Sequence, residues 1–135
     1  MIIKIEPDKE RAKSILALSA EREVYLKKIK KEGLESFPTI ILENYYEIAR
    51  ELIISIMYLD GFKTSGEGSH KELINYLKTY KEFSEHNLFV LDEMRIKRNN
   101  SAYYGIKPNP EFISQNEQTI KEIIENLKSL VKFKL

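Results

Sequence analysis

The sequence contains no cysteine and only two histidines, and both shortages limit the chemistry that the chain can perform. Without cysteine, the chain forms no disulfide bond and offers no thiolate ligand to a metal. The two histidines, His70 and His86, lie far apart in the sequence and belong to no metal-binding motif. We therefore expect no metal site and no cofactor within the chain.

Long hydrophobic runs are missing as well. The most apolar region, about 39–59, contains Glu43, Glu47, Arg50 and Glu51, and four charges argue against a membrane-spanning helix. The N-terminal residues become charged too early to form the apolar part of a signal peptide. These features predict a cytoplasmic protein with no membrane partner.

An excess of charge of either sign is also absent, because 22 basic residues stand against 21 acidic ones. The chain has 135 residues, of which 42% are hydrophobic and 32% charged, and this composition fits one soluble domain spanning 1–135. Against this neutral background, the segment from Arg95 to Lys107 holds four cations and no acid. This basic segment is therefore the main candidate for a functional region.

The few glycines and prolines, five and four in number, fall at the joints between stretches of helical apolar spacing. We predict helices over about 7–32, 38–60, 69–83 and 88–102, and a last helix that starts at 110 and is firm from 114. A glycine-rich connection is expected over 60–69, and no strand pair is evident. The sequence thus predicts an all-α fold, an up-and-down bundle of four main helices with one additional short or terminal helix.

Two local patterns refine this arrangement. Apolar residues cover more than one face of the 38–60 segment, which predicts the central and most buried helix. Ser69 and Glu72 form a capping-box pattern that opens the next helix. By position, His70 belongs to that helix start, and His86 belongs to a loop over 84–87.

An acidic row on the 38–60 helix allows two interpretations. Glu43, Glu47 and Glu51 recur at four-residue spacing, as side chains on one helix face do. The row is either a solvated stripe, or Glu47 or Glu51 orients an arginine of the basic segment.

The basic segment continues an apolar helix face with polar groups. Arg95, Arg98 and Asn99 follow one another at helical spacing, so they point the same general way. Burying an unpaired arginine is costly, so this face opens to solvent, meets acids or receives an anion. Tyr103 and Tyr104 either cap the core or offer stacking surfaces of the kind that nucleic-acid readers use.

The stretch 91–105 resembles the signature region of HEPN domains. These are small all-α bundles of prokaryotic toxin–antitoxin pairs, defence systems and RNA-processing enzymes. The family motif is an arginine, usually followed by a polar residue, with a histidine four to six positions later. Arg98-Asn99 matches its first half, and Tyr103 stands where the histidine would be. The resemblance covers about 35–130 and implies a homodimer in which the two motif helices face each other.

For RNA-cleaving members, the resemblance implies a metal-free reaction in which arginine and histidine from two protomers share a cleft. The 2′-hydroxyl of RNA then attacks the neighbouring phosphate. Arg98 and Tyr103 are the corresponding catalytic candidates. Tyrosine has an unperturbed pKa of about 10, so it is a poor base near neutral pH. Weak or absent nuclease activity is therefore expected.

Three functions are compatible with these residues. The first is binding of RNA or another phosphate-bearing ligand without strong catalysis. The second is an active metal-independent endoribonuclease, for example a toxin. The third is a non-catalytic partner of a separate nucleotidyltransferase, which would modify Tyr103 or Tyr104. The residues expected to bind a ligand are Arg95, Arg98, Asn99, Asn100, Tyr103, Tyr104 and Lys107.

Overall fold

The computed structural model describes residues 1–66 and 69–135, apart from the side chain of Ser69. In these residues the helices dominate, which confirms the prediction of an all-α fold. The elements in chain order are β1 (Ile2–Lys4), α1 (Lys9–Lys30), α2 (Pro38–Asp60), β2 (Phe62–Thr64), α3 (Ser69–Tyr76), the 3₁₀ turn η1 (Leu77–Thr79), α4 (Glu85–Tyr104) and α5 (Pro110–Lys134). No described helix is long and apolar enough to cross a membrane.

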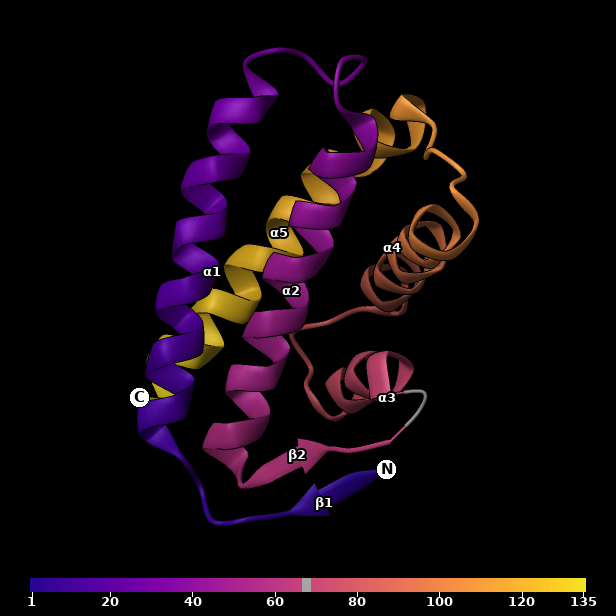
Figure 1. Ribbon diagram of the computed structural model, residues 1–135. Coiled ribbons are helices and arrows are strands. Elements are labelled where there is room, and N and C mark those ends of the chain that lie inside the picture. The colour runs from indigo at the N-terminus through magenta and orange to yellow at the C-terminus, as the bar shows by residue number, and fades with distance from the viewer. Residues whose placement is uncertain (67–68) are drawn as a thin grey trace.

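Helix α2 lies at the centre of the molecule. In Figure 1, α1 and α2 run antiparallel side by side, and α5 passes diagonally behind α2. Helices α3 and α4 pack on the other side of α2, and α4 is seen almost end-on in this view. Four long helices and one short helix are therefore present in the described chain, and α2 touches all the others.

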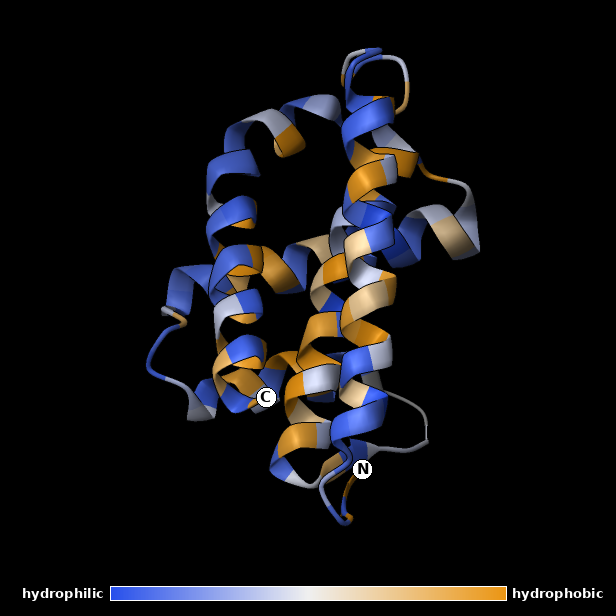
Figure 2. Ribbon diagram, turned by 90° about the vertical axis from the view of Figure 1, so that its left-hand side faces the viewer, coloured by the Kyte–Doolittle hydropathy of each residue, from blue (hydrophilic) through white to orange (hydrophobic). Residues whose placement is uncertain are grey.

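The core is built around α2, as its apolar pattern predicts. Ile41, Leu42, Ile48, Leu52 and Ile56 have no exposed surface. Figure 2 shows hydrophobic residues gathered where the helices face each other and hydrophilic residues on the outer sides. Since helix formation depends mainly on burying such a face, α2 provides the frame on which the other helices are positioned.

The start of α1 differs from the prediction. The helix begins at Lys9, two residues after Pro7, because Asp8 acts as its N-cap. The Asp8 carboxylate accepts a hydrogen bond from the Arg11 backbone N–H at 2.9 Å. The helix ends at Lys30, two residues before its predicted end.

The start of α4 also differs, because 84–87 is not a loop. The Ser84 side chain accepts from the Asn87 N–H and the Asn87 side chain accepts from the Ser84 N–H, both at 3.1 Å. This reciprocal cap starts the helix at Glu85 rather than Leu88 and places His86 in its first turn.

The third helix is shorter than predicted. It ends at Tyr76 and continues only as the 3₁₀ turn to Thr79, because the chain then extends at Tyr80. The hydroxyl groups of Tyr76 and Tyr80 both donate to the Asp60 carboxylate at the end of α2, which also accepts from Lys134 Nζ at 2.7 Å. These bonds hold Tyr76 and Tyr80 against the end of α2.

A strand pair is present, contrary to the prediction. Strands β1 and β2 pair antiparallel, with Ile3 opposite Lys63. Each strand has three residues, too few to give a recognisable alternating pattern. Strand β2 occupies the first part of the expected glycine-rich connection. Residues 67–68 of that connection, and the Ser69 side chain of the expected capping box, lie outside the described part of the chain.

Candidate functional site

The structure divides the basic segment between different faces of α4. Arg95 and Arg98 are three residues apart and point towards α2 and α3. Tyr103 follows Arg98 by five residues, which is about 140° around a helix axis. Its side chain is 71% exposed. The predicted catalytic pair of Arg98 and Tyr103 is therefore not brought together within one subunit, because helix geometry turns the two side chains apart.

Arg98 lies near His70 instead. His70 is the second residue of α3 and is half-buried against Tyr46, a fully buried residue of α2. The two rings stack with their centroids 5.8 Å apart and an interplanar angle of 15°. The Tyr46 hydroxyl oxygen lies 3.0 Å from His70 Nδ1. This hydrogen bond fixes the imidazole between α2, α3 and α4.

The protonation states of this pair follow from burial and charge. Burial lowers the pKa of His70, and the positive charges of Arg50 and Arg98 lower it further, so the ring is neutral near pH 7. Burial raises the pKa of Tyr46 to about 12, so its phenol keeps the proton. Both groups are therefore neutral near pH 7, and the hydrogen bond between the Tyr46 hydroxyl and Nδ1 leaves Nε2 for another partner.

The acids of α2 do not orient the basic segment, contrary to the second interpretation of the acidic row. Glu47 pairs with Arg50 one turn along α2, with 2.9 Å between the oxygen and the guanidinium nitrogen. Glu51 is buried and pairs with Arg22 of α1. Glu47 and Glu51 are thus not part of a solvated stripe, because both have arginine partners.

Positive charge remains in excess on the α4 side of the site. Asp92 accepts from Arg95 at 2.8 Å and lies 3.7 Å from Lys71, so one carboxylate serves two cations. Among the residues that the structure describes, the half-buried Arg98 donates only to the neutral Asn99 side chain, at 3.3 Å. Within residues 1–66 and 69–135, Arg98 has no ion-pair partner. We refer to Arg50, Arg95, Arg98 and His70 as the arginine cluster.

The other predicted binding residues lie towards the end of α4. This helix continues to Tyr104, two residues past its predicted end, and Tyr104 is 75% exposed. Asn100 and Lys107 line a separate cavity of about 110 Å³ at the turn between α4 and α5. The structure thus places the predicted residues in three places: the cluster, the exposed helix end and this small cavity.

Three residues of the site were not predicted from the sequence, namely Tyr46, Arg50 and His70. Arg50 gave one usable signal, since it is the only basic residue within the most apolar helix. Tyr46 and His70 gave none, because 24 residues separate them and only the packing of α3 on α2 joins them.

Comparison with protein families, curated proteins and solved structures gives no match to this chain. The resemblance to HEPN domains therefore stays a hypothesis that depends on the motif residues. Across the described residues, no three His, Asp or Glu side chains gather closely enough to hold a metal ion.

Proposed function

We propose that this protein binds single-stranded RNA, or another ligand that carries phosphate, through the arginine cluster. The observation that carries this proposal is the half-buried Arg98, which has no carboxylate partner in the described chain and lies beside a neutral histidine. A guanidinium group that has lost part of its hydration gains most from an anion that accepts two of its hydrogen bonds. Phosphate oxygens fit this need.

Two further features favour a nucleic acid among phosphate-bearing ligands. His70 presents a neutral imidazole beside the arginines, which adds an uncharged hydrogen-bonding group for phosphate or sugar. Tyr103 and Tyr104 are exposed at the end of the same helix and offer ring faces on which bases can stack. The likeness of Arg98-Asn99 to the HEPN motif supports RNA in particular.

Fluorescence anisotropy with a labelled single-stranded RNA tests this function. We expect binding to weaken steeply between about 50 and 200 mM salt, because phosphate contacts release counterions. Arg98→Ala should weaken binding about tenfold at low salt and reduce the slope of log K against log salt by about 0.7, the loss of one phosphate contact.

Arg11→Ala is the matched control. Arg11 lies at the start of α1, where it donates to the Tyr58 hydroxyl at 3.1 Å, so the variant loses the same charge outside the cluster. Its RNA affinity should stay within about twofold of the wild type, as expected for a distant surface charge. Equal losses in the two variants, or binding that does not respond to salt, would contradict the proposal.

A metal-independent ribonuclease is the second candidate, and the position of His70 favours it. A histidine that is neutral near pH 7 is a suitable base for the 2′-hydroxyl, through the ring nitrogen that carries no proton. This candidate predicts that RNA is cleaved in the presence of a chelator and that His70→Gln abolishes the cleavage. Gel electrophoresis that shows intact RNA after prolonged incubation with the wild type would eliminate it.

A further inference from the structure

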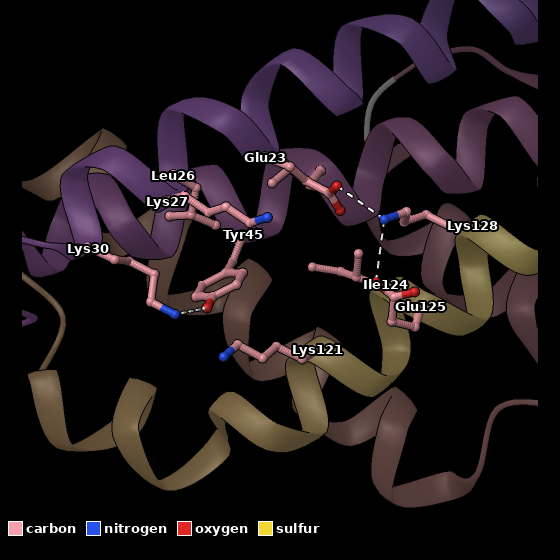
Figure 3. Close-up of a pocket in the computed structure, with 10 residues that line it drawn as sticks. Glu23, Leu26, Lys27, Lys30, Tyr45, Lys121, Ile124, Glu125 and Lys128 are labelled. Carbon is pink, nitrogen blue, oxygen red and sulfur yellow. Dashed lines mark hydrogen bonds and ion pairs between the residues drawn. The ribbon is translucent and has the colours of Figure 1, made fainter.

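A second cavity lies on another side of α2, away from the arginine cluster. It has a volume of about 360 Å³, is open to solvent on one side and lies between α1, α2 and α5. Helix α2 contributes Tyr45 and Ile48 to it, whereas the neighbouring Tyr46 faces α3. Figure 3 shows the lining side chains. The cavity is large enough for a small organic ligand, since pockets for such ligands begin at about 300 Å³.

The floor of this cavity is apolar. Leu26, Ile48 and Ile124 form it together with the ring of Tyr45, and each of them is almost fully buried. Such a surface offers no hydrogen bond to a fully hydrated ion. Binding of a ligand's hydrocarbon part there is favourable by about 0.8 kcal/mol for each methylene group that becomes buried.

One edge of the cavity is held by a fixed chain of hydrogen bonds. Lys30 Nζ donates to the Tyr45 hydroxyl, which in turn donates to Glu117, both at 2.8 Å, and Lys30 is 2.6 Å from the same carboxylate. Burial lowers the pKa of Lys30, but the hydrogen bonds to Glu117 and Tyr45 outweigh it, so the lysine stays charged. The opposite edge is similar, because Lys128 lies 3.2 Å from Glu23 and 3.4 Å from Glu125.

Two other lysines are far less constrained. Lys121 is 4.0 Å from Glu117, and Lys27 has no ion pair among the described residues. In Figure 3 both side chains extend towards Tyr45, Lys27 from α1 and Lys121 from α5. The four lysines of the rim exceed the three glutamates that pair with them by one positive charge.

We propose that this cavity binds a small amphipathic carboxylate, such as a short-chain fatty acid or an aromatic acid. The hydrocarbon part lies over the Tyr45 ring and the exposed edges of Leu26 and Ile124, and the carboxylate lies between Lys27 and Lys121. A single negative charge balances the excess of the rim. The apolar floor distinguishes this ligand from inorganic phosphate, which has no hydrocarbon to bury.

Titration of the protein with hexanoate, followed by NMR of the isoleucine methyl groups, tests the proposal. The Ile48 and Ile124 methyl signals should shift and saturate, while Ile113, which is buried outside the cavity, should not shift. Hexylammonium has the same chain with the opposite charge, and it should bind at least about tenfold more weakly, given the strength of charge-assisted hydrogen bonds. Equal binding of the two compounds, or shifts that never saturate, would overturn the proposal.

A pair of lysine variants locates the carboxylate. Lys27→Ala should weaken hexanoate binding about fivefold, because it removes a charged donor from the rim. Lys28→Ala removes the same charge from the next residue of α1, which is exposed and does not line the cavity, so its affinity should be unchanged. Equal affinities of the two variants would contradict the assignment. Arg98→Ala should leave hexanoate binding intact, so this test and the RNA test succeed or fail separately.

Discussion

Replacing Arg22 with alanine is expected to lower the free energy of unfolding by about 3 kcal/mol, a large part of a small domain's stability. The reason is the Glu51 carboxylate, whose side chain is only 5% exposed and which pairs with Arg22 across the contact between α1 and α2. One of its oxygens, Oε2, already has no hydrogen-bond partner in the described chain. Without Arg22, the buried charge loses its counterion.

The size of this effect should depend on pH. Burial raises the pKa of Glu51, and the hydrogen bond from Arg22 only partly lowers it again. A carboxyl group with a raised pKa in the folded state stabilises the protein in acid, and this stabilisation is lost as pH rises through the folded-state value. Arg22→Ala raises that value further, so its destabilisation should be smaller at about pH 5 than at about pH 8. Urea denaturation at both pH values measures the difference.

Two companion variants separate the buried charge from other causes. Glu51→Gln should cost less than Arg22→Ala, because the Arg22 side chain is 36% exposed and can turn towards water. Replacing both residues with apolar ones, as Arg22→Met with Glu51→Leu, should recover most of the loss. A loss in Arg22→Ala that is the same at both pH values would rule out the buried carboxylate as its cause.

Gly61→Ala is the second substitution with a large expected effect, about 2–3 kcal/mol of lost stability. Gly61 ends α2 with a φ of 87°, in the left-handed region that favours glycine. A Cβ atom there would lie 2.9 Å from the Ile5 carbonyl oxygen. The Ile5 segment cannot easily move away, because its N–H donates to the Gly61 carbonyl at 2.8 Å.

Gly105→Ala provides the matched control for this prediction. Gly105 ends α4 in the same way, with a φ of 67°, but no atom lies within 4 Å of the added Cβ position. Its loss should be about 1 kcal/mol, the cost of the left-handed backbone alone. Thermal or urea denaturation of the two variants gives the contribution of the Ile5 contact by difference. If both variants lose the same stability, that contact plays no part.

The helix bounds were predictable where a proline or glycine and the apolar pattern mark the same end of a helix. Pro38 and Asp60 bound α2 as predicted, because proline is accepted in the first turn and Gly61 stops the helix. The strands were not predictable, since their pairing joins residues about 60 positions apart. The bonds from Tyr76 and Tyr80 to Asp60, beside the end of the third helix, are long-range contacts that no local pattern reveals.

The candidate site was predictable only in part. Arg95 and Arg98 follow from their local density and helical spacing. Tyr103 was selected by its distance along the chain, whereas the direction of a helical side chain depends on its angle around the axis. His70 reaches the arginines because α3 packs against both α2 and α4, and the sequence carries no local sign of that packing.

The Asp60 carboxylate has a consequence for the order in which the chain assembles. It collects bonds from Tyr76, Tyr80 and Lys134, which lie 16, 20 and 74 residues further along. Closing a longer loop costs more chain entropy, so loop closure alone favours forming the tyrosine bonds before the bond to Lys134. On this ground we expect the C-terminal end of α5 to join this group after the two tyrosines.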